Sequence, residues 1–180
     1  MERLVLVTSR SFGDVVKVGI KELEDAGFQV DRVPNSKRPL NEKTLSRLLK
    51  ERRPEAMVVG AEPFTKEVIT SNPDLRVLAK HGVGYDNIDL DAATDAGVAV
   101  ANAPGTNTQS VADFALGLLL CLARSIPQAN ESTKSGGWER FTGTELYEKT
   151  VGVIGTGNIG REVVKRLQGF NPELLGYDVV

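Results

Sequence analysis

Several residue types are scarce in this 180-residue chain, and each scarcity excludes a class of protein. The single cysteine, Cys121, excludes an internal disulfide and is compatible with a reducing compartment, so we expect a cytoplasmic protein. The 22 basic and 24 acidic side chains give a formal net charge of −2. The chain therefore has no excess of positive charge with which to bind nucleic acid or an anionic membrane surface.

Long hydrophobic runs are also lacking. The longest apolar stretch, residues 114–123, is about half as long as a bilayer span and is bracketed by Asp113 and Arg124. The run Leu4–Val7 is too short for the apolar segment of a signal peptide. With 41% hydrophobic and 26% charged residues, the chain can still bury a core, and its composition is typical of a globular protein.

Short apolar runs alternate with helical patterns through the first hundred residues. The runs are residues 4–7, 28–33, 56–59, 75–79 and 98–101, and the helical patterns cover residues 14–26, 41–53, 65–69 and 90–96. Asn41 is a candidate cap for the second of these helices. This alternation predicts an α/β lobe over residues 1–101, with a five-stranded parallel sheet covered by helices on both faces.

The longest helical pattern runs from Thr106 to about Ile126 and is apolar on almost all sides. Ser110 and Asp113 have the spacing of a capping box at its start. Such a helix must be buried all round, either between layers or between subunits. Residues 130–149 are polar and are predicted to form an irregular arm. We therefore predict a homodimer, or a larger even assembly, through residues 109–149.

The strongest chemical signal is a G-x-G-x-x-G motif directly after the apolar run at residues 151–154. Gly155 permits a tight turn, Gly157 permits the approach of a pyrophosphate, and Gly160 permits close packing of the following helix. Asp178 lies 18 residues after Gly160, where a carboxylate binds the adenosine ribose of a dinucleotide. The motif predicts a nucleotide site, and the alternative is a glycine-rich turn without a ligand.

Nearly the whole chain resembles the D-2-hydroxyacid dehydrogenase family and, within it, most closely the phosphoglycerate dehydrogenase branch. The segments that carry the resemblance are His81–Asp89, Asn102–Asn107, Val111–Asp113, Gly143–Leu146, and residues 151–160 with Gly176–Asp178. The resemblance implies a flavodoxin-like substrate-binding lobe over residues 1–101. It further implies that residues 102–180 form the incomplete start of a Rossmann NAD-binding lobe, with a dimerisation helix and arm.

The resemblance also implies the site residues. The main-chain amides of Gly82, Val83 and Gly84 would hold the carboxylate of a small 2-hydroxy or 2-oxo acid, and Asn102 would line the cleft. The residues implied to bind the cofactor NAD are Val83, Val111, Gly155, Gly157, Asn158, Ile159, Gly160 and Asp178. NAD is expected over NADP because an ionised Asp178 repels a 2′-phosphate.

No residue of this chain is expected to be catalytic. In the family the catalytic arginine, glutamate and histidine follow the second nucleotide-binding strand, so His81 is expected to be a loop residue near the cleft. The 180 residues are therefore predicted to be an inactive amino-terminal part of an NAD-dependent oxidoreductase. The branch usually has an arginine for the substrate phosphate where this chain reads Gly60–Pro63, so 3-phosphoglycerate is one possible substrate among several.

Several residues have a structural and a functional interpretation. Lys80 would either steer an anionic substrate or be a solvated charge at a strand end. Gly82 and Gly84 either satisfy a turn or free an amide for a carboxylate, and the second is favoured. The polar residues 86–91 lack the spacing of a calcium loop and are predicted to form turns and helix caps, with no metal.

Two other classes of function stay open from the sequence. One is a nucleotide-sensing or scaffold protein that keeps the cofactor site without chemistry. The other is an excised folding unit in which the first lobe is stable alone.

Overall fold

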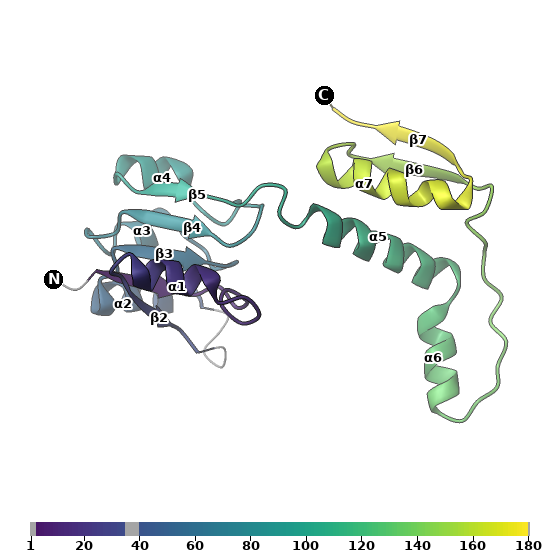
Figure 1. The fold of residues 1–180 in the computed structure, drawn as a ribbon, viewed down its shortest axis with the longest axis horizontal. Helices are drawn as coiled ribbons and strands as arrows, with labels where there is room; N and C mark the ends of the chain where they lie inside the picture. The colour runs from purple at the N-terminus through teal and green to yellow at the C-terminus, as the bar shows by residue number, and fades with distance from the viewer. Residues whose placement is uncertain (1–2, 35–39, 180) are drawn as a thin grey trace. The chain divides into compact units, whose positions relative to one another are not determined.

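The computed structural model describes residues 3–34 and 40–179, and the chain divides into two compact units (Figure 1). Unit 1 comprises residues 1–104 and unit 2 comprises residues 105–180. The division lies close to the expected boundary between residues 101 and 102.

Unit 1 alternates strands and helices along its whole length. Its elements are β1 (Leu4–Val7), α1 (Val18–Asp25), β2 (Gln29–Arg32), α2 (Glu42–Arg52), β3 (Ala56–Val59), α3 (Lys66–Ile69), β4 (Val77–Lys80), α4 (Leu90–Asp95) and β5 (Ala99–Ala101). The five strands pair in parallel in the order β2-β1-β3-β4-β5. This is the flavodoxin-like order, and the predicted five-stranded parallel sheet is confirmed.

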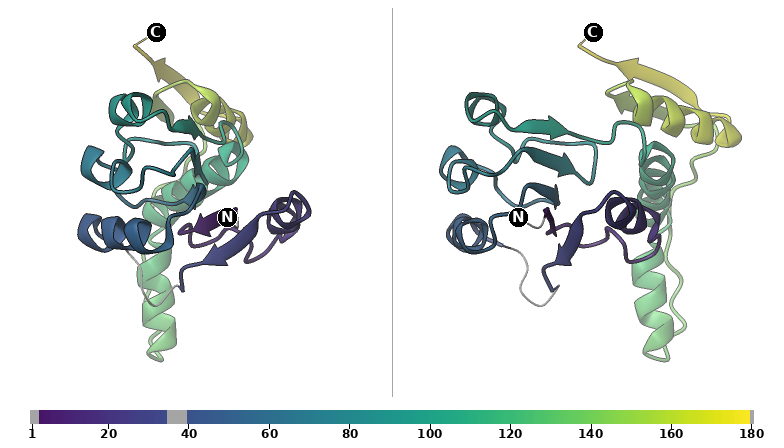
Figure 2. Two further views of the ribbon diagram at one scale, coloured as in Figure 1. Left: turned by 90° about the vertical axis from the view of Figure 1, so that its left-hand side faces the viewer. Right: turned by 60° about the vertical axis from the view of Figure 1, so that its left-hand side comes forward.

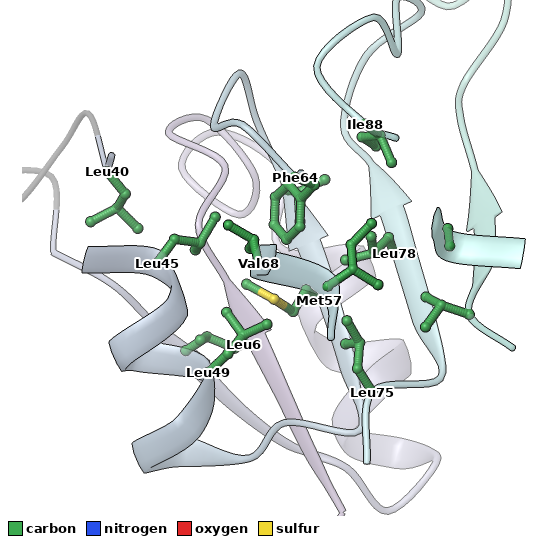
Figure 3. Close-up of a cluster of buried hydrophobic side chains, with 14 of the residues drawn as sticks. Leu6, Leu40, Leu45, Leu49, Met57, Phe64, Val68, Leu75, Leu78 and Ile88 are labelled. Atoms are coloured by element: carbon green, nitrogen blue, oxygen red, sulfur yellow. The ribbon is translucent and has the colours of Figure 1, made fainter. Parts of the chain in front are cut away.

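Helices cover both faces of this sheet, as Figure 2 shows, with α2, α3 and α4 on one face and α1 on the other. Successive side chains of a strand point to opposite faces, so each strand contributes to two apolar layers. Leu6 and Met57 pack against Leu45 and Leu49 of α2 in the larger layer (Figure 3). The buried valines of the smaller layer, such as Val58, contact residues of α1 and its flanking loops.

Two helices of unit 1 begin at the caps that the sequence predicts. The Asn41 side chain accepts a hydrogen bond from the Thr44 amide at 2.9 Å at the start of α2. Asp89 accepts from the Ala92 amide at 2.9 Å at the start of α4. The capping role predicted within residues 86–91 is therefore confirmed for Asp89.

Unit 2 contains one βαβ motif and two preceding helices. Its elements are α5 (Thr108–Ala123), α6 (Ile126–Lys134), β6 (Thr150–Ile154), α7 (Asn158–Leu167), the 3-10 helix η2 (Gln168–Phe170) and β7 (Glu173–Tyr177). The strands β6 and β7 pair in parallel. Arg166 of α7 joins α7 to α5, because its guanidinium donates to Asp113 and to the side-chain oxygen of Gln109.

Three expectations about the long helix are wrong. No side chain caps α5 at Asn107, and Asp113 pairs with Arg166 instead of completing a capping box. The helix ends at Ala123, because Ser125 has a φ of 51° and breaks the pattern. The next helix, α6, takes up the first part of the expected irregular arm, and it carries a proline in its first turn, where the lost amide costs little.

The α5 helix is not buried within this chain. Among its described residues only Ala112 is buried, whereas Phe114, Leu118 and Leu122 are exposed. Burial between subunits was the other alternative, and it stays a prediction. In the part of the chain that is described, no single helix is long and apolar enough to cross a bilayer. The pair α5 and α6 passes that test by length and composition, but the two helices are bent by 68°.

Candidate functional site

The topology of unit 1 marks one place on its sheet for a ligand. From β1 the chain passes to β2 on one side, and β3 lies on the other side, so the strand order reverses between β1 and β3. Open parallel sheets bind ligands outside the carboxyl ends of their strands at such a switch point. The loops that follow β1 and β3 should therefore border the site.

A cavity of about 500 Å³ lies at this switch point, within the usual range of ligand pockets. Its described lining comes from three strand ends and the segment before α2: Ser9, Arg10 and Ser11 after β1, Gly60, Ala61, Glu62 and Pro63 after β3, Lys80 and His81 at β4, and Leu40. Sequence reasoning identified Lys80 but missed the loop after β1. The signal that would have found it is the central position of β1 beside the switch point.

Glu62 fixes the loop after β3. Its side chain is 6% exposed, and Oε2 accepts hydrogen bonds from the Gly60 amide at 2.8 Å and the Thr8 hydroxyl at 3.4 Å. Both donors are uncharged, and no described cation forms an ion pair with this carboxylate. Glu62 therefore joins the ends of β1 and β3 and places one negative charge at the cavity wall.

Lys80 is held in the wall of the same cavity. Its Nζ donates to the Gly60 carbonyl at 2.6 Å and to Asn87 Oδ1 at 2.8 Å. Asn87 is itself fixed, because its Nδ2 donates to the Glu62 carbonyl at 2.6 Å. Lys80 is therefore not a freely solvated strand-end charge. An ammonium group has three donors, so one remains for a ligand.

The single histidine is anchored to the loop after β1. His81 Nδ1 lies 2.7 Å from Ser9 Oγ and 3.4 Å from Ser11 Oγ, and its ring meets the edge of Phe12 at a centroid distance of 5.5 Å. No described carboxylate is hydrogen-bonded to His81, so it lacks the third group that orients the base of a nucleophilic triad. It borders the cavity, as expected of a loop residue near the cleft.

The loop after β4 contains the three main-chain amides that were expected to hold a carboxylate. The Gly82 amide already donates to the Lys80 carbonyl at 3.0 Å. The amides of Val83 and Gly84 donate to no atom of the residues that the structure describes. Of the three amides expected to hold a carboxylate, these two are therefore available. Gly84 does not have a positive φ, so the backbone does not require glycine there.

Asn102 holds this loop in position. Its Nδ2 donates to the Val83 carbonyl at 2.8 Å, and the neighbouring Ala103 amide donates to the Gly82 carbonyl at 3.0 Å. The two bonds attach the loop to the chain just after β5. Asn102 thus orients the peptide unit of the Gly84 amide, and the Ala103 amide orients that of the Val83 amide.

In unit 2 the three glycines of the G-x-G-x-x-G motif have different structural causes. Gly155 has a φ of 89°, which favours glycine. A Cβ at Gly160 would lie 2.0 Å from the Gly155 carbonyl oxygen, so only glycine fits in the first turn of α7. Gly157 has a φ of −67°, and a Cβ there would meet nothing within 4 Å. The fold therefore explains Gly155 and Gly160 but not Gly157.

The amino terminus of α7 begins at this turn without a side-chain cap. Gly157 is the N-cap, and Asn158 and Ile159 are the first two helical residues. Amides in the first turn of a helix have no partner within the helix and carry the positive end of its dipole. The turn can therefore accept an anion at the residues that the sequence proposes for a pyrophosphate.

Asp178 lies beside the same turn. One carboxylate oxygen accepts from the amide of Thr156 and, at 3.0 Å, from its hydroxyl, and the other accepts from the Val179 amide at 2.8 Å. These bonds attach the end of β7 to the glycine turn. Each carboxylate oxygen can accept more than one hydrogen bond, so Asp178 can also accept from a ligand hydroxyl. Val111, the remaining residue of the predicted cofactor set, is half-buried in α5.

Comparison with known proteins identifies the family. Residues 5–171 match the model of the D-isomer specific 2-hydroxyacid dehydrogenase catalytic domain. The chain belongs to this family. The resemblance expected from the motifs is thereby confirmed, together with the α/β fold class.

The curated relatives include D-3-phosphoglycerate dehydrogenases from distant organisms. The chain is 43% identical to that of Homo sapiens over 163 residues and 41% identical to that of Methanocaldococcus jannaschii over 177 residues. These matches cover 89% and 97% of this chain, but only 30% and 32% of the two relatives. The chain therefore spans about a third of the length of these family members.

Solved structures of other proteins have the same fold. The TT0316 protein from Thermus thermophilus superposes with a TM-score of 0.85 at 28% identity, over 98% of this chain and 56% of that one. The NAD⁺-bound 3-phosphoglycerate dehydrogenase of Entamoeba histolytica has a TM-score of 0.79 at 25% identity, over 99% and 55%. Both likenesses extend over essentially the whole chain.

Proposed function

We propose that this chain is the amino-terminal part of an NAD-dependent oxidoreductase that acts on a small 2-hydroxy or 2-oxo acid. The family and the names of the relatives support the class of reaction. In this proposal residues 1–101 bind the substrate, and residues 102–180 begin the NAD-binding lobe. The single cysteine supports a cytoplasmic setting for the parent protein.

The observation that carries the cofactor proposal is Gly157. Neither its φ nor its surroundings require glycine, whereas a pyrophosphate lying against this turn would need the space that a side chain takes. The uncapped amides of Asn158 and Ile159 would then donate to the phosphate oxygens. Asp178 would accept from the ribose hydroxyls and disfavour the extra phosphate of NADP.

The substrate carboxylate would bind at the loop after β4. The amides of Val83 and Gly84 supply two donors, and Lys80, which precedes them in the chain, supplies a positive charge. Asn102 acts as a positioning residue through its bond to the Val83 carbonyl. Together these groups would hold the acid in one orientation, and orientation of a reactant lowers the barrier of a bimolecular step.

NAD, when bound, supplies the hydride acceptor for the substrate carbon that carries the hydroxyl. The described residues of this site would bind and orient the acid, but none of them is placed to accept its proton. The only histidine, His81, is anchored on Ser9, and Lys80 is held by two acceptors. We therefore propose that the 180-residue chain alone has no dehydrogenase activity.

A homodimer through residues 109–149 is part of the proposal. Phe114, Leu118 and Leu122 recur every four residues, so they lie along one face of α5, and all three are exposed. An apolar face of this kind is typical of a surface that another protein covers. A second copy of this chain is the proposed partner.

The experiment that tests the cofactor proposal compares two glycines that leave similar open space around a Cβ. Gly157→Ala should weaken NADH binding about 10-fold or more, because the new methyl group would stand where the pyrophosphate approaches. Gly152→Ala, in β6, is the matched control, since a Cβ there also meets nothing within 4 Å. NADH binding is measured by titration calorimetry, with circular dichroism to verify folding.

Equal NADH affinities for the two variants would refute the role of Gly157. NADPH binding as tightly as NADH would refute the role of Asp178. NADH binding by the parent protein without turnover of any 2-oxo acid would favour the alternative of a nucleotide-sensing protein.

A further inference from the structure

The cavity at the switch point contains a cation that the proposed function does not use. Arg10 lies in the loop after β1, is exposed, and lines the cavity with Ser9 and Ser11. It forms no hydrogen bond or ion pair with any residue that the structure describes. The other arginines of unit 1 that pair with carboxylates, such as Arg3 with Glu55 and Arg32 with Asp14, lie outside this cavity.

The charges around the cavity favour an anion near Arg10. Among the residues that the structure describes, the cavity lining holds two cations, Arg10 and Lys80, and one carboxylate, Glu62. Lys80 is bonded only to uncharged acceptors, so no carboxylate offsets its charge through these contacts. Glu62 is nearly buried and turned toward its own loop, with Oε2 on the Gly60 amide, whereas Arg10 is exposed. An entering ligand therefore meets the guanidinium at the accessible part of the wall.

The loop that carries Arg10 contacts the end of β4, and residues 82–84 follow directly after that strand end. Ser9 Oγ and His81 Nδ1 are 2.7 Å apart, and His81 is followed at once by Gly82. Residues 82–84 are not among the lining residues, but His81 is, so we infer that a ligand whose carboxylate binds the amides of Val83 and Gly84 extends past His81 into the cavity toward Arg10. The cavity of about 500 Å³ leaves room for such an extension.

We propose that Arg10, assisted by the hydroxyl of Ser11, binds a second anionic group at the far end of the substrate and so determines its specificity. The substrate is then a 2-hydroxy or 2-oxo acid that carries a phosphate, a phosphonate or a second carboxylate. A guanidinium suits this role because its planar array of donors matches two oxygens of such a group at once. This inference rests on the proposed function, because it takes the first carboxylate to be held at residues 83 and 84.

The loop after β3 supplies no cation to the cavity lining that the structure describes. At that position the chain has Gly60–Pro63, with Glu62 engaged in the structure of the loop. The cation comes instead from the loop on the other side of the switch point. Both loops border the same cavity, so Arg10 supplies the positive charge that the loop after β3 lacks.

The test is a nuclear magnetic resonance titration of the 180-residue chain with two acids that differ only in the second anion. D-glycerate and D-3-phosphoglycerate share the carboxylate and the 2-hydroxyl group. We expect D-3-phosphoglycerate to bind about 10- to 100-fold more tightly, the usual gain from charged hydrogen bonds. Both acids should shift the amide signals of Val83 and Gly84, but only the phosphate ester should shift those of Arg10 and Ser11.

Arg10→Gln should abolish this preference and leave the affinity for D-glycerate unchanged. Arg10→Lys should retain part of the preference, because it keeps the charge and loses the planar donor pair. The matched control is Arg47→Gln in α2, an exposed arginine outside the cavity, which should change neither affinity. D-malate, which carries a second carboxylate, shows whether that group can replace the phosphate.

The outcomes separate this inference from the proposed function. If both acids shift residues 83 and 84 but Arg10→Gln leaves their ratio unchanged, the role of Arg10 is refuted and the proposed function stands. If inorganic phosphate alone binds at Arg10 as tightly as the phosphate ester does, the cavity is an anion site unrelated to the acid, and the inference is refuted. If neither acid shifts residues 83 and 84, both proposals fail.

Discussion

Replacing Gly160 with alanine tests whether the glycine turn is built by close packing. The new Cβ would lie 2.0 Å from the Gly155 carbonyl oxygen and 3.0 Å from its carbon. Both atoms belong to the backbone, so no side chain can rotate away. Either the start of α7 or the turn must move by about 1 Å to restore an ordinary contact. The Gly155 amide resists this movement, because it donates to the Tyr177 carbonyl at 2.7 Å.

The expected loss of stability follows from two opposing terms. Overpacking of this kind costs about 1–3 kcal/mol, and the rigid backbone obstacle favours the upper end. Alanine is better than glycine within a helix by about 1 kcal/mol. Gly160→Ala should therefore lower the free energy of unfolding of unit 2 by about 2 kcal/mol. Gly157→Ala meets no atom and should cost less than about 1 kcal/mol, the difference between glycine and alanine at an N-cap.

Urea unfolding, followed through the amide signals of β6 and β7, measures this difference within unit 2. With a slope of about 2 kcal/mol per molar urea, Gly160→Ala should lower the midpoint by about 1 M. Unfolding that is no easier for Gly160→Ala than for Gly157→Ala would refute the packing argument. It would also show that close packing of α7 against the strand does not explain why the third residue of the motif is glycine.

Three further predictions concern the core, the pH dependence and the assembly. Leu45 is fully buried in unit 1, so Leu45→Ala should lower its free energy of unfolding by about 2–5 kcal/mol in urea denaturation. The hydrogen bond from Lys165, followed by that from Arg166, lowers the pKa of Glu162 in the folded state. The contribution of ionised Glu162 to stability is therefore present above the ordinary glutamate pKa of about 4.3 and is lost as the pH falls from there through the lowered pKa of the folded state. The urea midpoints at pH 3 and pH 6 should differ less for Glu162→Gln than for the unmodified chain. Leu122→Glu should convert a dimer to a monomer in analytical ultracentrifugation without unfolding it, because this side chain is exposed on α5, and a monomeric mass for the unmodified chain would refute the dimer.

Much of unit 1 could be predicted because its buried strands are short runs of apolar residues bounded by polar residues or glycine. The runs at Leu4–Val7 and Ala56–Val59 match β1 and β3 residue for residue. The fourth run was placed too early, because β4 begins at Val77 and not at Leu75. Leu75 is buried, but its amide bonds to the Asn72 carbonyl in a turn. Hydrophobicity alone does not distinguish a buried turn residue from a strand residue.

The candidate site was only partly predictable, for a physical reason. Local constraints require glycine at two positions, the positive φ at Gly155 and the close contact at Gly160, so the turn after β6 could be predicted from the sequence. The cavity of unit 1 is formed by three strand ends that are far apart in the chain. The residues next to Arg10 in the sequence do not indicate its role, because Arg10 lines the cavity only when β1 lies beside β3 in the folded sheet.

The contiguity of unit 1 has a consequence for how the protein is made. Every strand pairing in its sheet joins residues between Leu4 and Ala101. Domains generally fold as units while the chain is being synthesised, beginning with the amino-terminal one. The sheet can therefore close once β5 has emerged from the ribosome, and the cavity beside Arg10 would be complete before the glycine turn of unit 2 has been translated.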